Sequence, residues 1–182
     1  MEVLAIAGSL RAGSFNRGLV RAARALAPQG MTIVEADISE IPLYNGDTDS
    51  DESRPDAVTA LAEKVKSADA LLFATPEYNY SIPGVLKNTI DWLSRIPGGI
   101  FAGKPAAIMG ASMGGMGTSR SQYHLRQVLV FLDVHPLNKP EVFGSAAHTK
   151  CDENGDLTDE ATKEMIGKQL EALKAWTERL GA

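Results

Sequence analysis

Short, continuous apolar segments alternate with longer segments of helical periodicity along the chain, and this alternation constrains the fold more than any other feature. The apolar segments cover residues 3–7, 31–37, 70–74, 105–111 and 141–143. Because their positions are apolar in succession, we expect strands buried on both faces, which is typical of a parallel sheet. Helical periodicity follows each segment, at residues 16–27, 55–65, 83–94, 119–132 and 159–180. The sequence therefore predicts an α/β three-layer sandwich.

The length of 182 residues predicts a single domain spanning 1–182. Parallel strands in a chain of this length usually adopt one of two windings, the flavodoxin-like order 2-1-3-4-5 or a truncated dinucleotide-binding fold. Both windings place ligands at the carboxyl ends of the strands. We therefore expect the functional residues in the loops after the first, third and fourth strands.

Charge and composition exclude several classes of protein. The net charge of -5 argues against a nucleic-acid binder, and no apolar run approaches the roughly 20 residues that span a bilayer. The first residues lack the basic segment of a signal peptide, so none is expected. The single cysteine, Cys151, permits no intrachain disulfide and suits a reducing compartment, which predicts a cytoplasmic protein.

Three local features are less regular. Residues 38–54, with the acidic run 47–52, predict a long solvated loop. The polar first half of the helix at 119–132 leaves its buried face ambiguous; the inward candidates are Tyr123, Phe131 and either Gln127 or Val128. Thr158 is a plausible N-cap for the last helix.

The first loop, GSLRAGSFN at residues 8–16, gathers donors in front of a helix N-terminus. Ser9, Ser14 and Asn16 can donate neutral hydrogen bonds, and Arg11 adds charge and a planar fork. A phosphate monoester needs this many donors, because it carries three terminal oxygens and about two charges. The alternative is that Ser14 or Asn16 only caps the helix and that Arg11 is solvated.

The other two loops favour a flat ring. Residues 75–84 contain two prolines and two tyrosines, and such a stiff loop presents backbone groups at fixed positions; ordinary packing is the alternative. Residues 111–118 include Gly114, Gly115 and Gly117, which let the backbone approach a ligand closely; a flexible turn is the alternative. One phosphate-binding loop and two ring-framing loops together fit FMN.

Three motifs resemble the NADPH-dependent FMN reductase family, the flavodoxin-like group that includes bacterial quinone and chromate reductases. The motifs are GSLRAGSFN at 8–16, TPEYNYSIPGVLKNTIDW at 75–92, and GGMG at 114–117 with the following Leu125 and Arg126. The resemblance implies the five-stranded parallel sheet in the order 2-1-3-4-5. It also implies FMN-binding residues of three kinds: Ser9, Arg11, Ser14 and Asn16 at the phosphate, Pro76, Glu77, Tyr78 and Asn79 along the isoalloxazine, and Ser112, Gly114 and Gly115 at its pyrimidine side.

The resemblance further implies an activity. Members pass a hydride from NADPH or NADH to bound FMN and then reduce a quinone, an azo compound, free flavin or a metal oxyanion such as chromate. They form homodimers or homotetramers, with the helices at 83–94 and 119–132 near the interface. Since the flavin carries the redox chemistry, we expect no catalytic side chain and no metal. His124, His135 and His148 match no metal-ligand spacing and are expected at the surface or an interface.

Two other functions remain open. A flavodoxin-type electron carrier would share the fold, although such carriers are more strongly acidic than this chain. A domain that binds only NAD is the other alternative, and the missing G-x-G-x-x-G motif weighs against it. Glu77 is the one carboxylate in a proposed site loop; it could act as a base, but we expect it to bond to a neighbouring subunit or loop.

Overall fold

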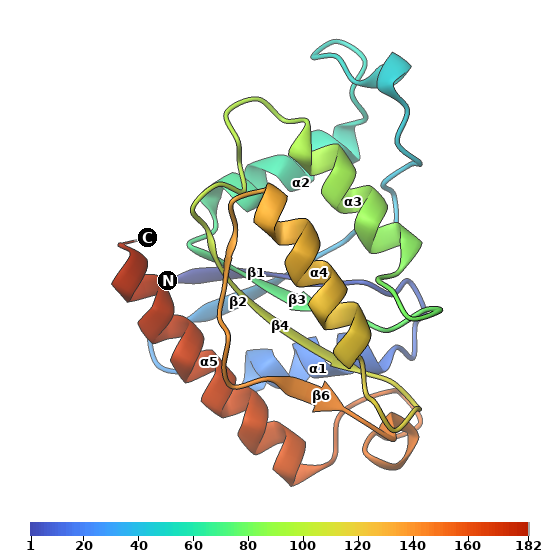
Figure 1. Ribbon diagram of the computed structural model, residues 1–182, viewed down its shortest axis with the longest axis vertical. Helices are drawn as coiled ribbons and strands as arrows, with labels where there is room; N and C mark the ends of the chain where they lie inside the picture. Colours follow the sequence, from blue (N-terminus) through green and yellow to red (C-terminus); the bar gives the residue numbers. More distant parts are fainter. Residues whose placement is uncertain (182) are drawn as a thin grey trace.

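A computed structural model describes residues 1–181 and places their strands in one six-stranded parallel sheet (Figure 1). The strands are β1 (Glu2–Ala7), β2 (Thr32–Ala36), β3 (Ala70–Ala74), β4 (Pro105–Ala111), β5 (His135–Pro136) and β6 (Val142–Gly144). The order is β2-β1-β3-β4-β5, and β6 also pairs with β4. The predicted flavodoxin-like order 2-1-3-4-5 is therefore confirmed, with a sixth strand added at one edge.

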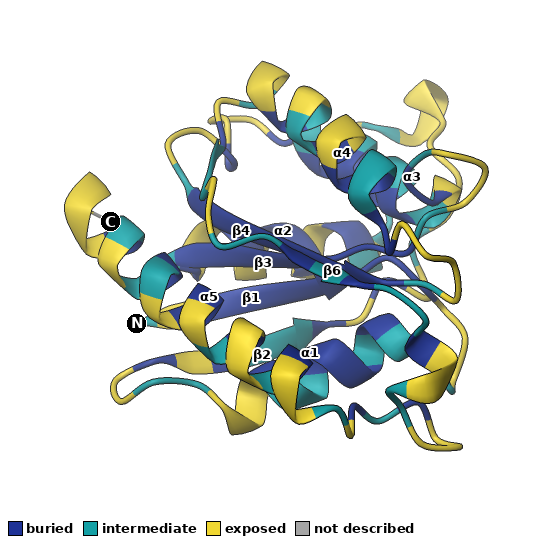
Figure 2. Ribbon diagram, turned by 60° about the horizontal axis from the view of Figure 1, so that its bottom comes forward, coloured by how far each residue is buried: buried dark blue, intermediate teal, exposed yellow. Residues whose placement is uncertain are grey.

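Helices cover both faces of the sheet, which confirms the three layers (Figure 2). They are α1 (Phe15–Ala25), α2 (Asp56–Ser67), α3 (Gly84–Ser94), α4 (Ser119–Phe131) and α5 (Glu160–Leu180). In β1, Val3 and Ala5 belong to the core under α1 and α5, whereas Leu4 and Ile6 belong to the core under α2, α3 and α4. Burial on both faces explains why the strands are continuous apolar runs.

The last edge of the sheet differs from the prediction of one fifth strand at 141–143. That segment corresponds to β6, which pairs with the end of β4, while β5 pairs with its start. Between them, the side-chain amide of Gln169 donates to the carbonyl groups of Ile108 and Pro140, at 3.0 and 2.9 Å. A two-residue strand leaves no apolar run in the sequence, so β5 could not be found there.

Helix α4 buries a face that excludes two of the inward candidates, Tyr123 and Phe131. Tyr123 and Phe131 are 57% and 89% exposed, Gln127 is exposed and Val128 is half-buried, so placing Tyr123 and Phe131 inward was wrong. The buried set is Ser121, Gln122, Leu125 and Leu129. Gln122 is tolerated in the interior because its amide donates to Thr118 Oγ1 at 3.0 Å and to the Val142 carbonyl at 2.8 Å.

Helix α5 is capped one residue later than predicted. A carboxylate oxygen of Asp159 accepts from the backbone N–H of Thr162 at 2.8 Å and from its hydroxyl at 2.6 Å. These hydrogen bonds hold the pKa of Asp159 below its usual value. Thr158 instead donates its hydroxyl to the Lys150 carbonyl. The carboxylate is the better partner for the positive end of the helix.

The long loop at 38–54 is present and carries the short 3-10 helix η1 (Gly46–Thr48). It is tied to α3, because Trp92 Nε1 donates to the Pro42 carbonyl at 2.8 Å and Asn88 also bonds to this loop. Within residues 1–181, no helix is both long and apolar enough to cross a bilayer.

Candidate cofactor-binding site

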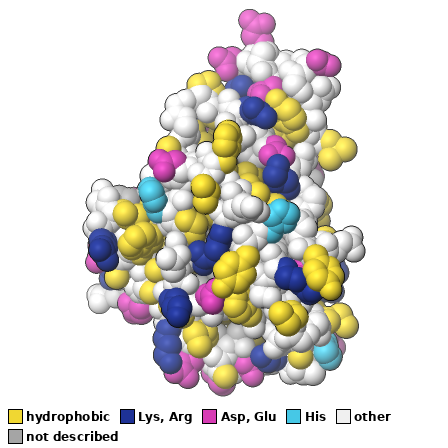
Figure 3. Space-filling view, viewed as in Figure 1, with side chains coloured by type: hydrophobic (Ala, Val, Ile, Leu, Met, Phe, Trp, Pro, Cys, Tyr) yellow, Lys and Arg dark blue, Asp and Glu magenta, His cyan; other side chains and the backbone are white. Residues whose placement is uncertain are grey.

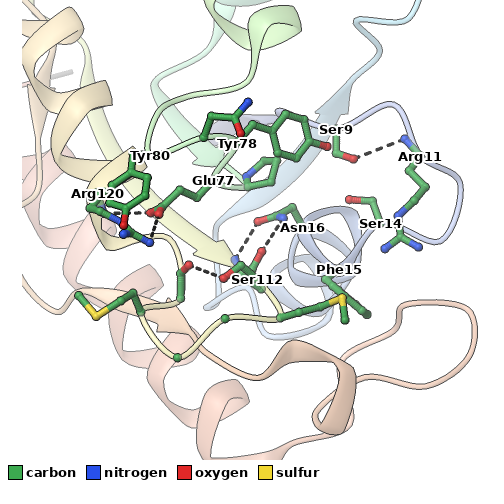
Figure 4. Close-up of a pocket in the computed structure, with 18 residues that line it drawn as sticks. Ser9, Arg11, Ser14, Phe15, Asn16, Glu77, Tyr78, Tyr80, Ser112 and Arg120 are labelled. Carbon is green, nitrogen blue, oxygen red and sulfur yellow. Dashed lines mark hydrogen bonds and ion pairs between the residues drawn. The ribbon is translucent and has the colours of Figure 1, made fainter.

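A cavity of about 640 Å³ lies at the carboxyl ends of β1, β3 and β4 (Figure 4). A small-molecule ligand of cofactor size needs a cavity in this range. The structure brings every binding residue expected from the sequence into its lining: Ser9, Arg11, Ser14, Asn16, Pro76, Glu77, Tyr78, Asn79, Ser112, Gly114 and Gly115. Parallel strands place their following loops at one edge, which is why segments distant in sequence meet here.

The loop between β1 and α1 presents free donors. Ser9 Oγ accepts from the backbone N–H of Arg11, and Ser14 Oγ accepts from that of Arg17 as the N-cap of α1, both at 3.4 Å. Neither hydroxyl donates a hydrogen bond to another group in residues 1–181, so each hydroxyl hydrogen remains available to a ligand. The first N–H groups of α1 lack intrahelical partners and add to this positive end.

Arg11 keeps its charge available. Among residues 1–181 it forms no ion pair, and its guanidinium lies 5.1 Å from the centre of the Phe15 ring. By contrast, Arg17 and Arg120 are both paired with glutamates. In a chain of net charge -5, an unpaired guanidinium beside two serines is locally suited to bind an anion.

Asn16 joins this loop to the end of β4. Its Nδ2 donates to the Ala111 carbonyl and its Oδ1 accepts from the Ala111 N–H, both at 2.9 Å, and the side chain is buried. The carboxamide thus extends the β4 ladder by one residue (Figure 4). One amide hydrogen of Asn16 is left for another partner.

The loop after β3 contains a tight two-residue turn. Tyr78 and Ser81 exchange backbone hydrogen bonds of 3.0 Å in each direction, with Asn79 and Tyr80 between them at φ values of 51° and 68°. Left-handed backbone at both central positions is typical of a type I′ turn, which favours Asn followed by Gly. Tyr80 is an unfavourable residue there, so tertiary contacts must hold it.

Those contacts come from the start of α4. Glu77 accepts from the backbone N–H groups of Arg120 and Ser121 at 3.1 and 3.2 Å and pairs with the Arg120 guanidinium. That guanidinium lies 3.6 Å from the centre of the Tyr80 ring. Figure 4 shows the Arg120 and Tyr80 side chains next to each other. Glu77 therefore bonds to the first turn of α4 in its own chain, where a neighbouring subunit or loop was expected.

The loop after β4 leaves open space at two glycines. A Cβ at Gly115 would meet nothing within 4 Å, and one at Gly114 would meet only Ser112 Oγ at 3.8 Å. Gly117 differs, because its φ is +58° and a Cβ would lie 3.0 Å from Phe143. Gly117 is required for the local fold, whereas Gly114 and Gly115 leave room for a ligand.

The cavity also has lining residues that the sequence did not predict as binding residues: Phe15, Tyr80, Ala111, Met113, Met116, Gly117 and Arg120. All of them except Arg120 lie within the three loops singled out in the sequence, and that position was the available signal. Arg120 depends on a contact with a residue 43 positions away and had no local signal. His124 is exposed and its Nδ1 bonds Ser81 Oγ at 2.8 Å.

The donor set fits FMN. One end of the cavity offers two serine hydroxyls, the first N–H groups of α1 and the free charge of Arg11, which match a terminal phosphate. The other end offers open space beside Gly114 and Gly115 and a stiff loop that contains proline and tyrosine, which match a flat ring. We call residues 8–16 the phosphate end, and the loops 76–80 and 112–117 the ring end.

Comparison with known proteins agrees with this chemistry. The sequence profile of NADPH-dependent FMN reductases matches residues 1–149. The chain is 58% identical over 180 residues to the NAD(P)H-dependent FMN reductase PA1204 of Pseudomonas aeruginosa, covering 99% of this chain and 97% of that protein. It is 45% identical over 182 residues to the quinone reductase of Escherichia coli K12, with the same coverage.

A solved structure is similar throughout. The flavoenzyme NAD(P)H:(acceptor) oxidoreductase FerB of Paracoccus denitrificans superposes with a TM-score of 0.87 at 33% identity, covering 98% of this chain and 97% of that one. These matches confirm the prediction of an FMN-dependent oxidoreductase with NAD(P)H as electron donor. The chain belongs to the NADPH-dependent FMN reductase family.

Proposed function

We propose that residues 1–182 form a single FMN-binding domain that oxidises NADPH or NADH and reduces a quinone. The observation that supports this most is the composition of the cavity, which joins a donor-rich phosphate end to an open ring end. FMN, when bound, supplies the two-electron chemistry itself. The protein is then required to bind, orient and shield, and no side chain need act as acid, base or nucleophile.

At the phosphate end, the proposed roles follow from which donors are free. Ser9 and Ser14 donate their hydroxyl hydrogens, and Arg11 contributes its charge. Asn16 offers only its second amide hydrogen, because Ala111 occupies the rest of its carboxamide. Asn16 therefore acts mainly by fixing the distance between the phosphate end and β4.

At the ring end, the proposed contacts are mostly with backbone. Pro76, Glu77, Tyr78 and Asn79 line one edge of the ring, and their turn is held by α4. On the other side, Ser112 and the N–H groups of Gly114 and Gly115 border the pyrimidine oxygens. Rigid donors placed in advance need little reorganisation during electron transfer.

A quinone is the proposed acceptor among the four classes considered. Met113 and Met116, which line the ring end, are 65% and 59% exposed, so a flat apolar molecule has a surface to rest on. The curated relatives named above include a quinone reductase. Azo compounds, free flavin and chromate remain competing acceptors to be assayed beside it.

A homodimer or homotetramer built on α4 is also proposed. Its outer face exposes Tyr123, Val130 and Phe131, whereas α3 exposes no large apolar side chain among its described residues. Figure 3 shows apolar side chains among charged ones on the face that carries α4. Light scattering on a sizing column should give a mass that is a multiple of 19.4 kDa, and Phe131→Glu should reduce that mass.

The single cysteine supports a cytoplasmic location.

The decisive experiment is anaerobic reduction of the purified, yellow protein. We expect NADPH or NADH alone to bleach the flavin absorbance and a quinone to restore it. Because donor and acceptor share one ring end, initial-rate plots for the two substrates should be parallel. Intersecting plots would contradict the shared site, and a colourless protein that does not take up added FMN would overturn the proposal.

The same titration separates the electron-carrier alternative. A carrier receives electrons from a partner protein, so NADPH alone should leave its flavin oxidised. Parallel assays with benzoquinone, an azo dye, FMN and chromate, each at several concentrations, then rank the acceptors by kcat/KM. A higher value for chromate than for benzoquinone would replace the proposed acceptor and leave the flavin site intact.

A further inference from the structure

A hairpin outside the cavity packs against the backbone of the phosphate end. This 151–157 hairpin begins and ends at the bridge between Cys151 and Leu157, and none of its residues lines the cavity. It also lies beyond residue 149, where the match to the family profile ends. The phosphate end and the hairpin are more than 130 residues apart in sequence.

The two segments meet through glycines, with no side chain between them. A Cβ at Gly18, in the first turns of α1, would lie 1.8 Å from the Gly155 carbonyl oxygen. A Cβ at Gly155 would lie 2.8 Å from the Gly13 carbonyl oxygen and 3.3 Å from the carbonyl carbon of Ser14. Gly155 also has a φ of +80°, which L side chains rarely adopt. Backbone therefore rests directly on backbone at this contact.

The hairpin is stiff enough to act as a support. One carboxylate oxygen of Asp152 accepts from the N–H groups of Asn154 and Asp156, at 2.9 and 2.8 Å. The backbone of Asp152 and Asp156 closes the turn with a further bond of 2.9 Å. Leu157 is 7% exposed and belongs to the core beneath α1, which anchors the hairpin to the domain.

A polar clamp fixes the hairpin to α1. Arg21 forms an ion pair with Asp156 and donates to the Asn154 carbonyl at 3.4 Å. Arg21 lies one turn beyond Gly18, so the clamp and the glycine contact act on the same helix. The start of α1 is thus held through residues that do not themselves line the cavity.

We infer that the 151–157 hairpin is the positioning element of the phosphate end, with Gly155 as its main positioning residue and the Asp156–Arg21 pair as its clamp. The hairpin keeps Gly13 and Ser14 where the α1 N–H groups and the Ser14 hydroxyl converge on a terminal phosphate. The inference rests on the proposed function, since it assumes that the FMN phosphate binds there.

The test compares binding of FMN and of riboflavin, which lacks the phosphate, to the full chain stripped of flavin. Gly155→Ala should raise the Kd for FMN at least tenfold and change the Kd for riboflavin less than twofold. The matched control is Gly30→Ala: Gly30 has a φ of +82°, yet a Cβ there would meet nothing within 4 Å. The control carries the same backbone strain and should leave both Kd values unchanged.

A gentler variant covers the case in which Gly155→Ala fails to fold. Asp156→Asn keeps the hairpin backbone and removes the ion pair, and it should raise the Kd for FMN two- to fivefold without affecting riboflavin. Hydrogen exchange in the flavin-free protein gives an independent measurement. The amides of residues 11–17 should exchange faster than in wild type in both hairpin variants, and at the wild-type rate in Gly30→Ala.

Equal effects on the two flavins, or an unchanged FMN Kd in a folded variant, would overturn the inference. The proposed function fails in a different way. If the wild-type protein itself binds FMN and riboflavin equally, the phosphate end has been misassigned. If the wild-type protein discriminates and the hairpin variants retain that discrimination, only the role of the hairpin is wrong.

Discussion

The phosphate end of the cavity is supported by backbone packed on backbone, whereas the ring end is bordered by glycines that face open space and by exposed side chains. Gly13 and Ser14 contact Gly155 so closely that no Cβ fits between them. At the ring end, a Cβ at Gly115 would touch nothing, and Met113 and Met116 are exposed. The difference matches the roles proposed for the two ends: one would hold a phosphate that stays bound, and the other would admit molecules that exchange.

Asn16 is the residue whose loss should have the largest effect, because it joins the two ends. Asn16→Ala leaves the N–H and C=O of Ala111 buried without partners, at a cost of about 2–4 kcal/mol of unfolding free energy. Urea unfolding followed by circular dichroism measures it. Asn45→Ala, in the exposed 38–54 loop, is the control and should cost far less. A loss below about 1 kcal/mol for Asn16→Ala would show that the ends are not coupled through this side chain.

Arg11 tests the phosphate end alone. Removing a charged hydrogen-bond donor costs about 1.5–3 kcal/mol, so Arg11→Ala should raise the Kd for FMN about 10- to 100-fold. Stability and the Kd for riboflavin should stay the same, because Arg11 forms no ion pair among the described residues. Arg24→Ala, near the other end of α1, is the charge-matched control. The assignment of the phosphate would be wrong if riboflavin binding fell in parallel.

Two glycines test the ring end. Gly115→Ala should leave thermal stability within about 0.5 kcal/mol of wild type and weaken FMN binding several-fold, since the new methyl group enters the cavity. Gly117→Ala should instead destabilise the protein by about 1–2 kcal/mol, because its φ of +58° is unfavourable for alanine. Calorimetry and flavin titration separate the two effects. Equal losses of stability would mean that Gly115 is also required for the local fold.

The smallest expected effect is the pH dependence of stability that comes from the Asp159 cap of α5, next to the hairpin that supports the phosphate end. Asp159 caps α5 directly after the 151–157 hairpin, and hydrogen bonds from Thr162 lower its pKa. A carboxyl whose pKa is lowered by folding stabilises the protein above its unfolded value, about 3.9, and this contribution is lost as the pH falls through the folded pKa. The difference in melting temperature between wild type and Asp159→Asn should therefore be present at pH 7 and shrink below about pH 4. A difference that is constant with pH would refute the electrostatic cap.

Features that depend only on a short segment of sequence could be predicted, and most residues that line the candidate site are among them. Apolar runs mark β1 to β4, and the motifs at 8–16 and 75–92 mark loops whose position follows from strand order alone. The sequence suggested two roles for Ser14, a helix cap and a phosphate donor. Its oxygen caps α1, and its hydroxyl hydrogen stays free to donate to a phosphate. The first loop by itself already indicated Ser9, Arg11, Ser14 and Asn16 as phosphate ligands, and the resemblance to FMN reductases added the roles expected of the residues in the other two loops.

Features that depend on distant partners could not be predicted. The buried face of α4 is set by Gln122 and Ser121, whose polar groups find acceptors in Val142 and Pro76. Hydropathy assigns such residues to the surface, and it assigned Phe131 to the interior. The pairing of Glu77 with α4 and the contact of Gly18 with Gly155 have the same character. Each becomes visible only when segments separated by 20 or more positions lie together.

The interrupted edge of the sheet affects how molecules of this protein meet at high concentration. A long, regular edge strand invites an unfolded or partly folded neighbour to add its own strand, which is a common route to aggregation. Here the edge is divided between β5 and β6, and the Ile108 carbonyl between them already accepts from Gln169. The side-chain amide thus takes up a backbone carbonyl group that an added strand would need, which disfavours strand addition on the β5–β6 side of the sheet.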